Sequence, residues 1–282
     1  IEFHGYNPTD ALIEIEPRED EYILSHGDII EAIKKHGDEL AMVYLGGLNY
    51  YTGQALDMRE IAIVSKENNV VVGFNLAHSA GNVHLDLHNW DVDFAAWCGY
   101  KYLNSSPGGV SGIFVHQRHE DKPELNRFAG WWGHDKESRF LMEPGFKPLK
   151  GAEGWQLSNA PVLGMAAHLA SLEIFHQAGM EDIGKKRDLL TAYLEFIILD
   201  ISNRNKDICE FEIITPKDKT KRGAQLSVLS HGKGKELFDK ITENGVIADW
   251  REPNVIRVAP APLYNSFEDC WFFGQILENA LD

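Results

Sequence analysis

The residues best placed to do chemistry are Tyr100 and Lys101, which directly follow the short apolar run 94–99. That run suits a buried strand and is too short for a helix. The segment 104–109 behind it is rich in serine, proline and glycine, which favour turns. Burial at a strand end favours the uncharged lysine amine, which is a nucleophile. The pattern therefore indicates either a nucleophilic lysine or one that only extends its charge into solvent.

Two further apolar runs also end in small or polar residues. The run 40–45 is followed by Gly46, and the run 70–74 is followed by Asn75 and His78. In open α/β sheets, ligands bind beyond the carboxyl ends of the strands. We therefore expect these residues to meet Lys101 at one rim of a sheet.

The elements that would hold this rim follow from hydrophobic periodicity. Helices are predicted at 25–37 and 58–69, and strands at 40–45, 70–74, 93–99 and 112–116. Strands that alternate with helices and are apolar on both faces are typical of a parallel or mixed sheet with helices on both sides. The predicted fold class is therefore α/β.

The pattern changes after residue 120. The segment 128–134 is an aromatic, glycine-rich loop, and 135–158 is irregular. The remainder predicts helices at 161–177, 180–201, 233–244 and 265–281, and strands at 211–215, 224–228, 246–249 and 255–258. We expect two domains: a large domain at 1–158, and a smaller α+β domain at 159–282 that includes the linking helix.

Composition narrows the classes of function. The chain has 282 residues, of which 44% are hydrophobic and 25% charged, as in ordinary globular proteins. Its net charge of −16 argues against nucleic acid and anionic membranes as partners. No apolar run reaches the roughly 18 residues that span a bilayer. Three cysteines without metal-type spacing indicate a reducing, cytoplasmic setting and no metal site.

Six blocks of sequence resemble the kynureninase family. They are YYTGQ at 50–54, GFNLAHSAGN at 73–82, VDFAAWCGYKYLN at 92–104, GWWGH at 130–134, LSNAP at 157–161 and IRVAPAPLYNS at 256–266. The resemblance runs in family order along the chain. It implies the fold of fold-type I pyridoxal phosphate enzymes, in which a three-layer large domain with a mainly parallel sheet carries a smaller C-terminal domain. It also implies that the family's N-terminal third, with its phosphate-binding turn, is missing.

The resemblance assigns roles to individual residues. Lys101 would form the Schiff base with pyridoxal 5'-phosphate, and Tyr100 would contact the cofactor phosphate and donate a proton. Arg257 would bind the substrate α-carboxylate through two parallel hydrogen bonds. The remaining cofactor contacts would come from His78 at the ring, Trp131 at a phosphate, often that of the neighbouring subunit, and Asn159 and Gly46. Asn159 and Ser158 would contact the substrate ring, although Asn159 could also be only a helix N-cap.

One position departs from the family. Asn75 stands where the family has an aspartate that contacts the pyridine nitrogen. A carboxylate there keeps the nitrogen protonated, so that the ring accepts electrons; an amide carries no charge. Asn75 therefore also supports a catalytically weak or silent homologue that keeps only the fold and its dimer contacts.

The implied activity is hydrolysis of L-kynurenine or 3-hydroxy-L-kynurenine to the corresponding anthranilate and L-alanine, a step of tryptophan catabolism. The implied assembly is a homodimer with shared active sites. Another fold-type I enzyme, such as a cysteine desulfurase or aminotransferase relative, would keep Lys101 but not the blocks around Trp131 and Arg257.

Overall fold

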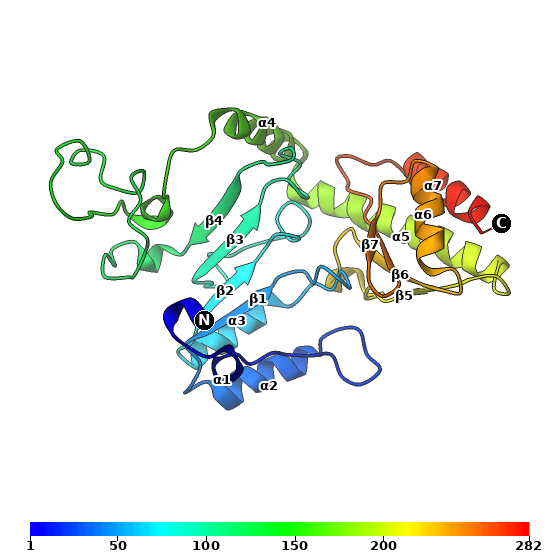
Figure 1. Cartoon of the computed structure of the whole chain (residues 1–282), viewed down its shortest axis with the longest axis horizontal. Coiled ribbons are helices and arrows are strands. Elements are labelled where there is room, and N and C mark those ends of the chain that lie inside the picture. The colour runs from blue at the N-terminus through cyan, green and yellow to red at the C-terminus, as the bar shows by residue number, and fades with distance from the viewer. Residues whose placement is uncertain (282) are drawn as a thin grey trace.

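The structure is a computed structural model that describes residues 1–281 and contains two four-stranded β-sheets (Figure 1). The first has the order β1-β2-β3-β4, formed by Met42–Gly46, Val71–Asn75, Phe94–Cys98 and Ser111–Val115. β1, β2 and β3 run parallel, and β4 is antiparallel to β3. The sheet is therefore mixed, and the carboxyl ends of three neighbouring strands share one edge.

Helices α2 (His26–His36) and α3 (Met58–Glu67) cover one face of this sheet. Each begins with a side-chain cap: Ser25 accepts a hydrogen bond from the backbone N–H of Asp28, and Asp57 from that of Glu60. Such caps stabilise a helix by about 1 kcal/mol each. The apolar stripes of the helices pack on the inward side chains of the strands, and the resulting core comprises Ile29, Ile33, Val43, Met58, Ile61, Ala62, Val64, Val72, Phe74 and Ala95 among others. This packing holds the strand ends rigidly.

The start of β3 is fixed by a buried carboxylate. Asp93 is 3% exposed, accepts a hydrogen bond from the backbone N–H of Val72 and pairs with Lys66, Arg118 and His119. Burial disfavours its charge, but the bonds from these partners outweigh burial and lower the pKa of Asp93. These contacts brace the start of β3.

The opposite face of the sheet carries exposed apolar side chains, among them Met42, Tyr44, Val71 and Ile113. The predicted pattern of strands apolar on both faces is thus present. Within residues 1–281, the layer formed by α2 and α3 covers the other face.

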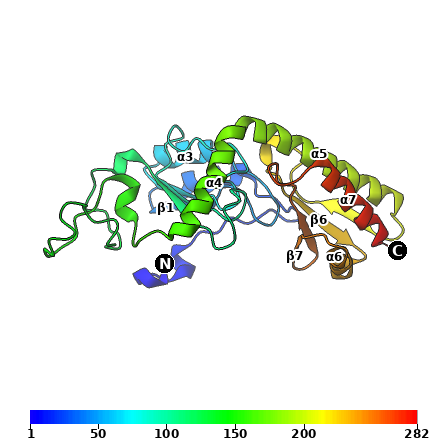
Figure 2. The ribbon, with the colours of Figure 1, turned by 90° about the horizontal axis from the view of Figure 1, so that it is seen from above.

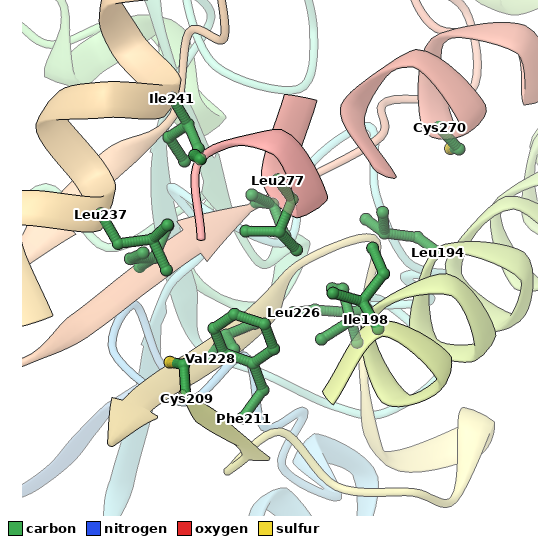
Figure 3. Close-up of a cluster of buried hydrophobic side chains, with 14 of the residues drawn as sticks. Leu194, Ile198, Cys209, Phe211, Leu226, Val228, Leu237, Ile241, Cys270 and Leu277 are labelled. Atoms are coloured by element: carbon green, nitrogen blue, oxygen red, sulfur yellow. The ribbon is translucent and has the colours of Figure 1, made fainter. Parts of the chain in front are cut away.

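The second sheet has the order β5-β6-β8-β7, and all its neighbouring strands are antiparallel. Its strands are β5 (Glu210–Ile213), β6 (Leu226–His231), β8 (Val255–Val258) and β7 (Asp249–Arg251). Its helices are α5 (Met180–Arg204), α6 (Gly234–Glu243) and α7 (Phe267–Asn279). Their inward side chains form one core with the sheet (Figure 3), to which Leu194, Ile198, Cys209, Phe211, Leu226, Val228, Leu237, Ile241, Cys270 and Leu277 contribute.

A long connection separates the two sheets. Residues 116–161 contain only the short 3-10 helices η2 (Gln117–His119) and η3 (Gly151–Trp155), and they protrude from the end of the molecule opposite the second sheet (Figures 1 and 2). Helix α4 (Val162–Ala178) then leads into α5. The remaining short elements are η1 (Glu2–His4), α1 (Pro8–Ala11) and η4 (Lys219–Lys221). Among residues 1–281, no helix has the length and apolar character needed to cross a membrane.

Two local predictions were wrong. The strand predicted at 246–249 lies at Asp249–Arg251 instead, because these three residues are the ones that pair with β8. The N-cap of α4 is Pro161, so Asn159 is not a helix cap. The boundary between domains at 158 and 159 remains a prediction.

Candidate functional site

A cavity of about 540 Å³ lies where the carboxyl ends of the first sheet meet the second sheet. Its lining from the first sheet includes Gly46 at the end of β1, Asn75 at the end of β2 with His78 after it, and Lys101 after β3. The second sheet contributes Arg251 and Arg257, and the remaining lining residues are Leu24, Leu45, Leu48, Asn49, Tyr50, Leu56 and Ala77. Five of the predicted site residues thus line one cavity.

Hydrogen bonds between the two halves of the chain hold the cavity walls together. Gln225 donates to the carbonyl of Tyr50 at 3.0 Å, and Thr215 donates to the carbonyl of Thr52 at 2.6 Å. Asn82, in the turn after β2, accepts from the backbone N–H of Ala224 at 2.9 Å. The turns that carry the site are therefore anchored to the second sheet.

Lys101 and His78 form the polar centre of the cavity. The Nζ atom of Lys101 lies 3.1 Å from Nε2 of His78. Burial, and then the positive charges of Lys101, Arg257 and Arg251, lower the pKa of His78 to about 4. The imidazole is therefore neutral near pH 7, and its Nε2 can accept a hydrogen bond from the Lys101 amine.

Asn75 ends β2 and makes a local turn. Its Oδ1 accepts a hydrogen bond from the backbone N–H of Ala77 at 3.0 Å. The side chain is exposed towards the cavity, with no carboxylate among the lining residues. A ring nitrogen at this position would therefore meet a neutral amide.

Arg257 lies on β8, and its guanidinium is largely buried. Nη1 donates to the carbonyl of Tyr50, Nη2 forms an ion pair with Asp249, and Nε is buried without a partner in the described chain. Burial lowers the pKa of Arg257 from its ordinary value. The anionic partner that a buried arginine needs is thus present within the protein as Asp249.

Tyr100 and Gly46 flank the polar centre. Tyr100 is 51% exposed, and its ring centre lies 5.8 Å from Nζ of Lys101. A hydrogen bond with Cys98 raises the pKa of the Tyr100 phenol. A Cβ atom added at Gly46 would meet only backbone atoms of Leu48, the nearer at 3.4 Å, so the protein itself does not require glycine there.

Four predicted residues, Tyr100 among them, do not line the cavity within residues 1–281. Trp131 lies in the protruding connection, is 46% exposed and packs edge-on against Phe140. Ser158 and Asn159 are exposed in the same connection. The structure therefore brings the other five predicted residues together in one cavity but leaves these four outside its lining.

The sequence matches two protein families. One, described as Aminotransferase class-V, matches residues 12–228, and the other, described as Kynureninase C-terminal domain, matches residues 184–277. The chain belongs to the class-V aminotransferase family. Its similar relatives are kynureninases.

The kynureninase of Flavobacterium johnsoniae is 54% identical over 281 residues, which cover 100% of this chain and 66% of that protein. The kynureninase of Myxococcus xanthus is 49% identical over an alignment that covers 99% of this chain and 64% of that protein. That of Nematostella vectensis is 46% identical, covering 99% and 62%. The chain thus groups with the kynureninases of the class-V family and spans about two thirds of the length of these relatives.

Solved structures confirm the fold. A cysteine desulfurase from Thermococcus onnurineus NA1 has a TM-score of 0.71 at 18% identity, covering 94% of this chain and 64% of that one. A C-DES mutant with glycine covalently linked to its PLP cofactor has a TM-score of 0.72 at 19% identity, covering 92% and 65%. The predicted fold-type I architecture is therefore correct for this class-V family member.

Among the residues that sequence reasoning missed are two that contact or face Arg257 and one that pairs with it. Tyr50 and Arg251 line the cavity, and Asp249 pairs with both Arg251 and Arg257. The signal was the alternation of charged residues at 249 and 251, which places both on one face of a strand. The predicted strand ends at 249, so Arg251 lies outside it and the prediction does not place the two charges on one face.

Proposed function

We propose that the protein is a kynureninase, which hydrolyses L-kynurenine or 3-hydroxy-L-kynurenine to an anthranilate and L-alanine. Overall, one water molecule is consumed as the bond between Cβ and Cγ is cleaved. The observation that carries the proposal is the Lys101 amine, 3.1 Å from a neutral His78, in a cavity that Arg257 also lines. The identity of 46–54% to kynureninases over nearly the whole chain supports it.

The residues present fit pyridoxal 5'-phosphate. The cavity offers a lysine amine for the aldehyde, an imidazole and an amide for the ring polar atoms, and a guanidinium with a buried, unpaired Nε for a carboxylate. Lys101 would hold the cofactor covalently, with His78 and Asn75 at its ring and Gly46 leaving room beside it. When bound, the cofactor supplies an electron-accepting ring conjugated to the substrate Cα.

The chain's own residues then bind the substrate and move protons. Arg257 binds the α-carboxylate and so places Cα near Nζ of Lys101. Nζ of Lys101, once free, accepts the proton from Cα as a general base, and the neutral His78 Nε2 accepts a hydrogen bond from the resulting ammonium. Tyr100, whose ring centre lies 5.8 Å from Nζ of Lys101, supplies a proton to Cβ once the bond between Cβ and Cγ is cleaved.

We also propose a homodimer in the cytoplasm. The protruding connection and the start of α4 expose Phe128, Trp131, Phe140, Met142, Val162 and Leu163, and exposed apolar surface of this kind marks interaction sites. A second copy on this surface would bring Trp131 to a neighbouring active site. Cys98, Cys209 and Cys270 are free thiols, which suits a reducing compartment.

The second candidate is a catalytically silent homologue that keeps the fold. The neutral Asn75 side chain at the end of β2 is the observation that favours it. The affinity for the cofactor would be preserved and the turnover lost.

The test uses the protein expressed from its whole reading frame and supplied with pyridoxal phosphate. We expect visible absorbance from the lysine-bound cofactor, and release of fluorescent anthranilate together with L-alanine from L-kynurenine. 3-Hydroxykynurenine is assayed in parallel. Borohydride reduction followed by peptide mapping should place the label on Lys101.

Each outcome separates the candidates. Label on another lysine, for example Lys66 beside Asp93, would contradict the assignment of Lys101. Visible absorbance without turnover of either substrate would support the silent homologue. Release of alanine from cysteine in the presence of dithiothreitol, which reduces the transferred sulfur to sulfide, would identify a desulfurase instead.

A further inference from the structure

The hairpin formed by β7 and β8 places three charged residues on one face. Asp249 lies directly opposite Arg257 in the antiparallel register. Arg251 is two residues beyond Asp249 on the same strand and therefore projects to the same side. Both arginines line the cavity that contains Lys101. The arrangement concentrates two guanidinium groups and one carboxylate at the cavity wall.

A single oxygen of Asp249 joins the two arginines. Its Oδ2 lies 3.0 Å from Nη2 of Arg251 and also forms the ion pair with Nη2 of Arg257. The Asp249 side chain is 41% exposed, whereas that of Arg257 is 10% exposed. The carboxylate therefore stands at the edge of the site and reaches inward to the buried guanidinium.

The contacts of Arg257 determine which of its edges is free. Nη1 is held by the carbonyl of Tyr50 and Nη2 by Asp249, so two points fix the plane of the guanidinium. Nε is buried and has no hydrogen-bond partner in the described chain. A carboxylate is bound best by two parallel N–H groups of an arginine, and the edge with Nε and the second Nη2 proton offers them. The two contacts therefore set the orientation of this edge, which a substrate carboxylate would use.

We propose that Asp249 is a positioning residue for the substrate carboxylate, acting through Arg257 and steadied by Arg251. The inference rests on the proposed function, in which Arg257 binds that carboxylate. Preorganisation of this kind lowers the ordering cost of binding. If Asp249 were only a countercharge, it would weaken the attraction of the cavity for an anion. The two roles predict opposite changes in affinity when Asp249 is removed.

The experiment compares Asp249→Ala with Asp249→Asn in the holoenzyme. Alanine removes the oxygen that joins the arginines, whereas asparagine keeps an oxygen acceptor without the charge. For Asp249→Ala we expect KM for L-kynurenine to rise about tenfold or more and kcat to change less than about threefold, as for a loss of uniform binding. Asp249→Asn should show a clearly smaller rise, which is rescue by the conservative variant.

A binding measurement without turnover accompanies the kinetics. Calorimetric titration with L-alanine, the amino-acid product, should show an affinity about tenfold weaker in Asp249→Ala, equivalent to about 1.4 kcal/mol. L-Alaninamide lacks the carboxylate, so its affinity should change less than about twofold. The matched control is Asp239→Ala, which removes an exposed carboxylate paired with Lys235 on α6, outside the cavity lining. It should leave KM and both affinities unchanged.

Three results would overturn the proposal. An unchanged or lower KM in Asp249→Ala would indicate a countercharge. Equal KM rises for the alanine and asparagine variants would show that an oxygen acceptor at position 249 does not position Arg257. Lower thermal stability with unchanged L-alanine affinity in the folded protein would indicate a structural brace only.

The failure of the proposed function is distinguishable from these results. Suppose that the wild-type protein turns over no kynurenine but binds L-alanine, and that Asp249→Ala weakens the binding of L-alanine but not that of L-alaninamide. The positioning role then stands and the proposed function falls. If the wild-type protein does not bind L-alanine, both fall.

Discussion

At the scale of single residues, the site depends on charges that lie close together in a partly buried space. Lys101, Arg251 and Arg257 are cationic, and their charges act with burial to keep His78 neutral. A buried histidine beside a lysine is therefore a hydrogen-bond acceptor here rather than a second cation. Asn75 adds a polar group without charge. Because a neutral amide does not favour a protonated ring nitrogen, the expected activity of the site depends on this residue.

We predict that Asn75→Asp raises kcat for L-kynurenine in the whole protein. The turn should survive, because an aspartate oxygen can accept the same hydrogen bond from the N–H of Ala77. A lost charge interaction at a catalytic site costs about 2–4 kcal/mol. Because Asn75 is exposed in this chain, we take the lower value, which corresponds to about 30-fold in kcat. Steady-state kinetics with cofactor-saturated protein measure it.

Asn49→Asp is the matched control for this prediction. Asn49 also lines the cavity, and its Oδ1 accepts hydrogen bonds from the N–H groups of Tyr51 and Thr52, which an aspartate would keep. It adds the same charge at another position and should not raise kcat. A similar rise in both variants, or none in Asn75→Asp, would show that the charge at the end of β2 is not what limits the reaction.

His78 predicts a specific dependence of stability on pH. Its pKa is about 4 in the folded protein, against an ordinary value of 6.5. Between these values the unfolded state binds more protons, so stability falls as pH decreases from 6.5 to 4 and this loss ends below 4. His78→Gln should reduce the difference in unfolding free energy between pH 7 and pH 4.5, measured by urea unfolding.

Other groups will keep part of that pH dependence. Burial also lowers the pKa of His116, so the variant should retain some loss of stability in acid. His4→Gln, at an exposed position, serves as the control and should behave like the wild-type protein. If the difference in unfolding free energy between pH 7 and pH 4.5 were the same in His78→Gln and the wild-type protein, unfolding would not make His78 easier to protonate.

At the scale of elements, the ends of parallel strands collect the functional groups. β1, β2 and β3 each end at the same edge, and each is followed by at least one cavity residue. Gly46, the last residue of β1, and the adjacent Gly47 have different surroundings. A Cβ at Gly47 would lie 2.7–2.8 Å from side-chain atoms of Met58, Leu76 and Ser79, whereas one at Gly46 would meet only backbone atoms of Leu48.

We therefore predict that the two alanine variants affect different properties, stability in one and cofactor affinity in the other. Gly47→Ala should destabilise the protein by about 1–3 kcal/mol, because it overpacks the core between α3 and the turn after β2. Gly46→Ala should change stability by less than about 0.5 kcal/mol. Its methyl group would occupy cavity space, so we expect the affinity for pyridoxal phosphate to fall about tenfold. Thermal unfolding and cofactor titration measure the two effects, and normal cofactor affinity in Gly46→Ala would exclude Gly46 from the cofactor site.

At the scale of the whole molecule, the protruding connection separates Trp131 from the cavity of its own chain. The segment 116–161 extends away from the second sheet, as Figures 1 and 2 show. Its exposed apolar side chains, together with those at the start of α4, would be covered in a dimer. A shared site then requires residues from two copies.

Mixing inactive variants tests this arrangement. We predict that Lys101→Ala and Trp131→Ala, each inactive alone, regain activity when their subunits are exchanged. Random pairing makes about half of the dimers mixed, and each mixed dimer holds one intact site, so about a quarter of wild-type activity should return. Lys101→Ala mixed with His78→Gln should recover nothing, because both residues line the cavity of the same chain. No recovery in the first mixture, with subunit exchange verified, would contradict a shared site.

Much of the fold could be predicted because periodicity and local chemistry reflect it directly. The helices at 26–36 and 58–67 and the strands at 71–75, 94–98 and 255–258 lie within a few residues of their predicted positions. The convergence of Asn75, His78 and Lys101 followed from their positions at parallel strand ends. The strand at 249–251 is displaced from its predicted position, because its bounds are set by pairing with β8, which the periodicity of 246–249 does not record.

Local sequence is enough to recognise the family, the α/β class and the lysine at the strand end, because each of these is recorded in short segments of the chain. Which distant residues share the cavity, and whether His78 is charged, depends on tertiary packing. Arg257 meets Asp249 through strand pairing and Tyr50 through contact between the two halves, and the histidine is neutral because burial and cations from three segments surround it. Such contacts depend on the packing of segments as far as 207 residues apart, which no local pattern records.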